Sequence, residues 1–305
     1  MKSSGHNMVC FLIFFSSLHV CAQTGIWNTP NAYLAQQAPV DTPKVFAGGQ
    51  ILRDSGIVLS RVAFTADGRE FYYTFARHWF SSEGTGVKRI VFDGTTWRKP
   101  EIICDNLSNP TLSLDGRILY LHGSGNTVYK MERVGEGWGS SVKFLDLPYA
   151  LYNFMPTRSG RFYAGSNGDR GKKSDYSAYD FSVLTIKPGD TVITSLGAPL
   201  NTPGFDGDLY VAPDESFMII STHETPTYEC ELYISFRRKN GSWKEPLSLG
   251  PLINDGKAHR FGQYVSPDGK YLFYTKGTNE NDCNFYWVRW DNLFKKLKAQ
   301  SDRTD

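Results

Sequence analysis

The chain is poor in cysteine, in long apolar runs and in net charge. It has 305 residues, with 33 Lys and Arg against 31 Asp and Glu, a formal net charge of +2. A near-neutral chain without a basic block argues against nucleic acid or an anionic membrane surface as the partner. Beyond residue 22 no segment is long and apolar enough to span a bilayer, so we expect a soluble chain outside the cytoplasm.

Cysteine is too scarce for a disulfide scaffold. Only Cys104, Cys230 and Cys283 lie beyond residue 22, an odd number, and a chain of this length can bury a core without covalent links. Cys230 and Cys283 each precede an expected strand at equivalent places in two successive repeats. We therefore favour a shared repeat position over a disulfide between them.

Residues 1–22 have the features of a secretory signal peptide. Lys2 gives a weakly basic start, residues 9–15 are apolar but too short to span a membrane, and Val20-Cys21-Ala22 offers a cleavage site. A lipoprotein anchored through Cys21 is less favoured, because bulky residues precede that cysteine. The sequence predicts a secreted or periplasmic protein.

A repeated motif dominates the rest of the chain. Its clearest copy is Ser266-Pro267-Asp268-Gly269 followed by an aromatic strand, and weaker copies cover 65–74, 113–120 and 212–221, with a degraded one at 157–163. The aspartates, or the residue aligned with them, fall at 67, 115, 159, 214 and 268, with spacings of 48, 44, 55 and 54. A period of this size indicates four-stranded propeller blades.

The pattern inside each repeat agrees with four strands. A short apolar strand precedes each turn, and a strand rich in Tyr, Phe and Ile follows it. Asp93-Gly94 and Asn240-Gly241 are strong two-residue hairpin signals. Trp97, Trp138 and Trp243 follow such hairpins, and we favour packing at the blade rim over a sugar-stacking platform.

The ends of the repeat region predict how the ring closes. Segment 43–51 aligns with 246–253, and both precede a motif by a similar distance, so the N-terminal segment is expected to supply the outer strand of the last blade. Five motifs then give an all-β propeller of five blades, with six as the alternative. The expected divisions are a signal peptide (1–22), a lead segment (23–42), the propeller (43–293) and a charged tail (294–305).

These motifs resemble the TolB-like propeller repeats, which are Ser-Pro-Asp-Gly relatives of WD repeats. More narrowly, the chain is similar to secreted members from the Bacteroidetes. The resemblance rests on 266–275 followed by 284–288, and on 212–221 followed by 231–237, and it covers nearly the whole chain beyond the signal peptide. It implies an extracytoplasmic propeller that acts as an interaction module, although the fold hosts binders and enzymes alike.

Loops on the face opposite the Asp-Gly turns are the expected ligand-binding face, because they vary while the scaffold stays constant. The turn aspartates themselves are interpreted as turn formers that bond their own backbone. No sequence motif for a metal or a cofactor occurs, so neither is expected. The repeat register assigns these residues to the opposite face and the adjoining channel: Arg61, Arg77, His78, Asn109, Asn153, Asp206, Asp208, His223, Glu224, His259 and Arg260.

Two functions fit this face. The first is recognition of a glycan, a cell-wall fragment or an extracytoplasmic protein, with Tyr149, Tyr152, Tyr176 and Tyr228 nearby. The second is a glycan-active hydrolase or lyase that uses the face carboxylates. Asp206 and Asp208 lie two apart on a strand and therefore share a side, which counts against a simple acid and base pair and favours the binder.

A structural role competes with a ligand site for the charged channel residues. A charge on an innermost strand needs a partner or solvent. We favour an ion pair between Arg61 and Asp208, or between Arg260 and Asp206, as that partner. Nothing in the sequence predicts an oligomeric state.

Overall fold

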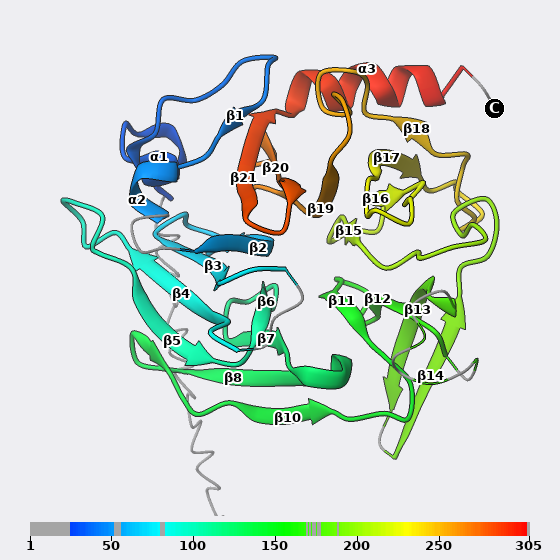
Figure 1. The fold of residues 1–305 in the computed structure, drawn as a ribbon, viewed down its shortest axis with the longest axis horizontal. Helices are drawn as coiled ribbons and strands as arrows, with labels where there is room; N and C mark the ends of the chain where they lie inside the picture. Colours follow the sequence, from blue (N-terminus) through cyan, green and yellow to red (C-terminus); the bar gives the residue numbers. More distant parts are fainter. Residues whose placement is uncertain are drawn as a thin grey trace, which may run out of the picture.

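Five antiparallel sheets surround a common centre, with their first strands innermost (Figure 1). The computed structural model describes residues 25–51, 56–79, 83–168, 170, 172, 175, 178–187 and 189–303. The predicted signal peptide, with its alternative anchor at Cys21, lies outside the described residues, as does Tyr176. Within the described residues, no helix is long and apolar enough to cross a membrane.

Each sheet is one propeller blade and follows one sequence repeat. Blade one comprises β2 (Ile57–Phe64), β3 (Glu70–Ala76), β4 (Gly86–Val91) and β5 (Glu101–Asp105). Blade two comprises β6 (Ser108–Leu112), β7 (Ile118–His122), β8 (Val128–Val134) and β10 (Val142–Leu145). The short strand β9 (Gly137–Trp138) also pairs with β8. Blade three comprises β11 (Tyr152–Pro156), β12 (Phe162–Ser166), β13 (Asp180–Lys187) and β14 (Asp190–Ser195). Blade four comprises β15 (Leu209–Val211), β16 (Phe217–Thr222), β17 (Glu231–Phe236) and β18 (Leu247–Ser248). The prediction of five blades is confirmed, and the described residues form no sixth blade.

The fifth blade joins the two ends of the propeller. It comprises β19 (His259–Val265), β20 (Tyr271–Asn279), β21 (Asp282–Arg289) and, as its outer strand, β1 (Lys44–Val45). Lys44 pairs with Trp287 and Val45 with Tyr286, so closure by the N-terminal segment is confirmed. The strand is shorter than the predicted 43–51, because Gly48–Ile51 forms the helical turn α2 instead of an extended strand.

Aromatic packing holds this closure. Phe46, which directly follows β1, is 1% exposed and packs edge-on against Phe273 and Trp287 of the fifth blade. It also contacts Phe71 of the first blade. One ring thus lies between the first and last blades, and each such aromatic pair stabilises the fold by about 1 kcal/mol beyond the burial of apolar area.

The described residues also include three further short helices. The lead segment forms η1 (Ile26–Asn28) and α1 (Ala32–Ala35), and η2 (Ser124–Asn126) lies within blade two.

The motif turns have the geometry that the sequence predicts. In the fifth blade an Asp268 carboxylate oxygen accepts hydrogen bonds from the Ser266 hydroxyl at 2.7 Å and from the Lys270 backbone N–H at 3.3 Å. Gly269 follows with a φ of +72°, a left-handed conformation that favours glycine. Asp67, Asp115 and Asp214 each accept the backbone N–H two residues on, so these aspartates are turn formers.

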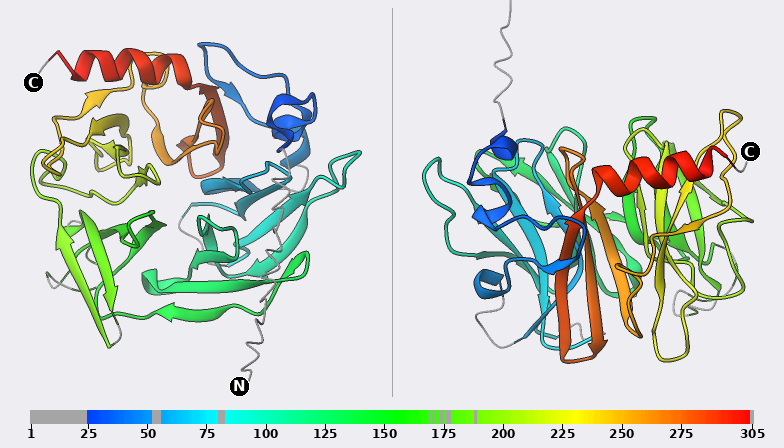
Figure 2. Two further views of the ribbon diagram at one scale, coloured as in Figure 1. Left: turned by 180° about the vertical axis from the view of Figure 1, so that it is seen from behind. Right: turned by 90° about the horizontal axis from the view of Figure 1, so that it is seen from above.

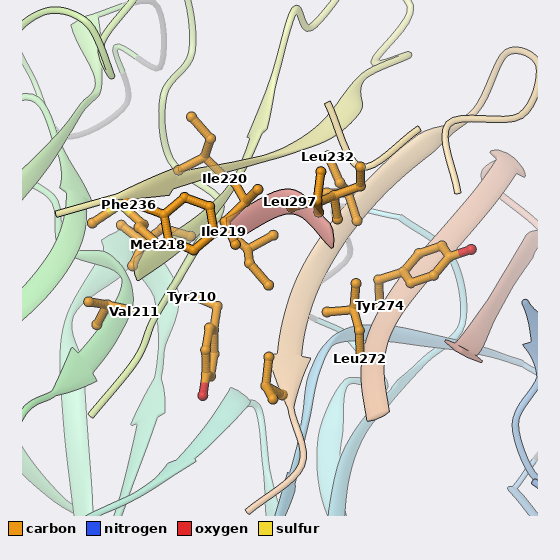
Figure 3. Packing of buried hydrophobic residues seen from close by; sticks show 14 of the residues in the cluster. Tyr210, Val211, Met218, Ile219, Ile220, Leu232, Phe236, Leu272, Tyr274 and Leu297 are labelled. Carbon is orange, nitrogen blue, oxygen red and sulfur yellow. The ribbon is translucent and has the colours of Figure 1, made fainter. Parts of the chain in front are cut away.

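The C-terminal segment forms helix α3 (Asp291–Ser301) along the outside of blades four and five (Figures 1 and 2). The expected boundary between propeller and tail, at 293 and 294, falls inside this helix. Leu297 is 5% exposed and belongs to the same cluster as Met218, Ile219 and Leu232 of blade four (Figure 3). The helix therefore buries an apolar side against the propeller and leaves its lysines outside.

The rim tryptophans contact neighbouring groups, and the three described cysteines form no disulfide. Trp243 is 6% exposed, and the indole N–H groups of Trp97 and Trp138 donate to the Asn31 carbonyl and the Tyr72 hydroxyl. These contacts support the interpretation of the tryptophans as packing residues of the blade rim. All three described cysteines are free thiols, as the repeat-position interpretation expects.

Candidate functional site

A buried polar network closes the central channel. It is built from one position that recurs six residues before each motif aspartate or its equivalent: Arg61, Asn109, Asn153, Asp208 and Gly262. The Asn153 carboxamide oxygen accepts from Arg61 Nη2 at 2.5 Å and from Asn109 Nδ2 at 2.7 Å. Its Nδ2 donates to Asp208 Oδ1 at 2.5 Å. We call Arg61, Asn109, Asn153 and Asp208 the channel plug.

Bulges in the innermost strands aim these side chains across the channel. Asn109 and Asn153 have φ values of +58° and +55°, and the pairing register of β6 and β11 shifts next to them. Asparagine tolerates this left-handed conformation better than most residues. Gly262 adopts the same conformation, and a Cβ there would lie 2.1 Å from the Ser60 carbonyl oxygen. The local sequence thus allows the strands to approach closely around the plug.

Opposite charges meet in the plug through an amide and not directly. Burial lowers the pKa of Arg61 to about 10, although the charge of Asp208 opposes this. Burial also raises the pKa of Asp208 to about 6, against the hydrogen bond from Asn153 and the charge of Arg61. The expected Arg61–Asp208 ion pair is therefore replaced by a bridge through Asn153. Arg61 and Asp208 remain close enough to stabilise each other's charge.

A cavity opens on the face of the Asp-Gly turns, and Arg61 of the plug is among its lining residues. Its volume is about 1070 Å³, slightly above the roughly 300–1,000 Å³ typical of ligand pockets. Arg61 marks its inner end, because among the β2 residues that line the cavity it lies farthest from the turn. Tyr210, Tyr264 and Met155 line the walls, and Arg158 lies near the mouth. We call this space the turn-face cavity.

The opposite face holds three carboxyl groups with raised pKa values. Burial raises the pKa of Asp206 to about 7, against hydrogen bonds from Thr202. Burial, and then the charges of Asp208 and Asp206, raise that of Glu224 to about 7. Asp206 and Asp208 are 0% and 3% exposed, whereas Glu224 is partly exposed. Only one of the three is therefore accessible to a substrate.

Arg260 holds the loops between blades four and five. It donates to the carbonyl oxygens of Ile253, Cys230 and Ala258 at 2.9–3.2 Å. Its carboxylate partner is Asp255, at 3.1 Å, and not Asp206 as expected from the sequence. Asp255 also binds Lys276 at 2.7 Å, so it joins two cations at the edge of the fifth blade. These contacts make Arg260 a structural residue of the loop.

The remaining predicted site residues are separated from the plug. Arg77, His78 and His223 are exposed on loops of blades one and four. His259 is 9% exposed and stacks with the ring of Tyr228. The structure thus brings together the four plug residues. Arg77, His78, His223 and His259 do not belong to that network.

Sequence reasoning missed several residues of the channel and its rim. Gln263 donates to the Asp208 carbonyl at 2.7 Å, and His122 accepts from the Phe154 backbone N–H at 3.1 Å. Glu215 occupies the turn position that is glycine in the other four blades. A break in the motif at that position was the available signal for Glu215. Gln263 directly follows Gly262, which occupies the recurring plug position in the fifth blade. Its hydrogen-bond partners belong to blade four, so no pattern in the sequence around Gln263 indicates them.

The fold and the plugged channel define a five-bladed β-propeller. No protein-family model matches the chain, and no curated protein sequence matches it. Solved structures of similar fold include a putative TolB from Agrobacterium tumefaciens, at 12% identity over 82% of this chain and 77% of that one, with a TM-score of 0.46. The periplasmic gluconolactonase of Pseudomonas aeruginosa is 17% identical over 72% of this chain, with a TM-score of 0.44. The chain spans 65% of that enzyme's length. These similarities concern the fold.

Proposed function

We propose that the chain is an extracytoplasmic binding module that takes a carboxylate-bearing segment of a glycan, a cell-wall fragment or a protein into the turn-face cavity. The observation that carries this proposal is the cavity itself, about 1070 Å³ in volume, with the buried Arg61 among its lining residues. A buried cation without a carboxylate in direct contact favours an anionic group in the adjacent space. Secretion or periplasmic location, through the predicted signal peptide, is part of the proposal.

The walls of the cavity suit recognition of a polar chain. Tyr210 and Tyr264 offer aromatic surface near the inner end, and their buried hydroxyl groups stay protonated because burial raises their pKa values. Arg158 is exposed near the mouth, and among the described residues its side chain has no partner. Aromatic walls with a few charged groups are typical of sites that fix the orientation of a ligand.

The alternative function is a glycan-active hydrolase or lyase on the opposite face. It is supported by Asp206 and Glu224, whose raised pKa values suit a proton donor near neutral pH. Against it, Asp206 is fully buried and bonded to Thr202, so it is not placed to touch a substrate. The binder is therefore the better supported function.

A binding screen separates the two faces. The purified protein is tested against bacterial glycans, cell-wall fragments and peptides with free carboxylates, and the hits are repeated with Arg61→Gln and Arg158→Ala. Each variant is expected to weaken binding about tenfold or more, since a charged contact contributes roughly 1.4 kcal/mol or more. Arg77→Ala on the opposite face is the matched control and is expected to bind normally.

Two results would contradict the proposal. Loss of binding in Arg77→Ala with normal binding in Arg158→Ala would move the ligand to the opposite face. Release of shortened products from a glycan, abolished by Glu224→Gln, would establish the enzyme instead.

A further inference from the structure

Three potential metal ligands meet where blades four and five join on the face opposite the turn-face cavity. Glu224 follows β16, Cys230 precedes β17, and His259 begins β19. A carboxylate oxygen, the thiol sulfur and an imidazole nitrogen all lie within 4.8 Å of one another. Donor atoms around a tetrahedral zinc ion lie about 3.5 Å apart, so the three groups need to move by only about 1 Å.

The imidazole of His259 supplies an independent sign of a ligand. The residue is 9% exposed, and among the described residues neither ring nitrogen has a hydrogen-bond partner. A buried donor or acceptor without a partner destabilises the folded protein, and proteins rarely leave both nitrogens of a ring unpaired. The rings of Trp79 and Phe261 pack against the imidazole with centroids 5.4 Å and 4.3 Å away. These walls hold the ring beside the thiol and keep water from its faces.

The thiol of Cys230 is already held by the backbone around it. The Cys230 N–H donates to the Ala258 carbonyl at 3.0 Å, and the Arg260 N–H donates to Sγ at 3.2 Å. The Ser221 hydroxyl lies 3.1 Å from Sγ. The shorter hydrogen bond of that hydroxyl, 2.6 Å, goes to the Arg260 carbonyl, to which the thiol also donates at 3.1 Å. The Arg260 N–H is therefore the donor that orients the sulfur and stabilises a thiolate when a metal replaces the thiol proton. Binding releases the thiol proton to solvent, together with the Glu224 proton where that carboxyl is protonated, and His259 binds as the neutral ring.

We propose that Glu224, Cys230 and His259 bind a zinc ion with a fourth position left for water or a ligand. Sulfur and imidazole donors with one carboxylate suit zinc better than the hard cations calcium and magnesium. This site is separate from the proposed ligand cavity, which lies on the opposite face. The sequence contains no zinc motif, because the ligands come from two blades and are 6 and 29 residues apart.

Metal titration of the reduced, chelator-treated protein tests the site. One equivalent of Zn²⁺ is expected to bind, and Co²⁺ is expected to give visible bands together with the near-ultraviolet charge-transfer band of a thiolate ligand. Cys230→Ser is expected to lose the charge-transfer band and about 100-fold or more in affinity. Cys283→Ser is the matched control, because Cys283 is also buried and free at the equivalent repeat position, and its band is expected to stay.

Further variants distinguish the site from a folding defect and from surface histidines. Glu224→Gln changes a partly exposed side chain, and it is expected to keep the far-ultraviolet circular dichroism spectrum while zinc affinity falls about tenfold or more. His223→Gln, next to the site and exposed, is expected to bind like the unmodified protein. No saturable zinc binding by the folded protein would overturn the proposal, as would a thiolate band that survives in Cys230→Ser.

Discussion

Glu215 links blades three and four, and replacing it should weaken the whole propeller. Its carboxylate is 3% exposed and accepts hydrogen bonds from Thr157 at 2.8 Å and Tyr163 at 2.9 Å. It also contacts the guanidinium groups of Arg161 and Arg237. The residue has a φ of +60°, at the turn position that is glycine in the other blades. The left-handed conformation costs a residue with a Cβ about 1–2 kcal/mol, so the contacts of the carboxylate must outweigh that cost.

The pKa of Glu215 measures how strongly the fold favours its charged form. Burial alone would raise this pKa, but hydrogen bonds from Ser159, Thr157 and Tyr163 and the charge of Arg161 lower it from 4.5 to about 2. A difference of this size corresponds to about 3 kcal/mol. Arg161 and Arg237 are 35% and 24% exposed, so water stabilises part of their charge once the carboxylate is removed. We therefore expect Glu215→Gln to lower the free energy of unfolding by about 2–3 kcal/mol at pH 7.

The effect should depend on pH in a defined direction. Because the pKa of Glu215 is lower in the folded protein, its stabilising contribution is fully present above pH 4.5 and is lost as the pH falls from there toward 2. The difference in unfolding free energy between the unmodified protein and Glu215→Gln should therefore shrink over that interval. Urea denaturation at pH 7 and pH 3, followed by tryptophan fluorescence, measures this difference.

Two further variants separate the ionic network from the backbone conformation. Glu215→Ala loses the network but keeps the strained conformation, whereas Glu215→Gly also relieves the strain and should be about 1 kcal/mol more stable than the alanine variant. Glu132→Gln is the control, because its side chain is 65% exposed and forms an ion pair with Lys130 on the surface, and it should leave the free energy of unfolding almost unchanged. A Glu215→Gln variant as stable as the unmodified protein, or a difference that does not vary with pH, would refute the reasoning.

Three substitutions test the closure, the channel and the helix by the same denaturation assay. Phe46→Ala should lower the free energy of unfolding by about 3–5 kcal/mol, since it removes the ring that packs between the first and last blades. A decrease below about 1 kcal/mol would show that this ring does not hold the closure. Gly262→Ala should lower the free energy of unfolding by at least about 3 kcal/mol, because its Cβ would lie 2.1 Å from a backbone carbonyl oxygen. Gly116→Ala is the control: it has a similar φ but open space around it, and it should lower that free energy by about 1 kcal/mol. Equal effects of the two substitutions would contradict the close approach of the strands. Leu297→Ala should cost about 2–4 kcal/mol and Lys296→Ala almost nothing, and the reverse order would mean that α3 packs through another side.

Local patterns predicted the architecture because each repeat encodes its own blade. The Asp-Gly turn at Gly269 requires a left-handed residue, and the aromatic strand after it pairs with its neighbours wherever the repeat occurs. Closure by Lys44 and Val45 was also predictable, since the segment aligns with the outer strand of another blade. The extent of that strand was not, because Gly48–Ile51 turns into a helix after Phe46 enters the core.

Contacts between repeats were beyond the sequence. The register placed Arg61 and Asp208 around one channel, but only the tertiary structure shows that Asn153 bridges them. It likewise pairs Arg260 with Asp255 instead of Asp206. A partner across the channel depends on the relative rotation of blades, which a repeat pattern does not record.

By itself, then, the sequence determined the kind of blade, the number of blades and the strand that closes the ring, because these depend on turn chemistry and residue alternation within about 50 residues. The tertiary structure alone decided that the cavity lies on the face of the Asp-Gly turns. It also decided that Cys230 meets His259, since both depend on which side chains of different blades come together when the ring closes.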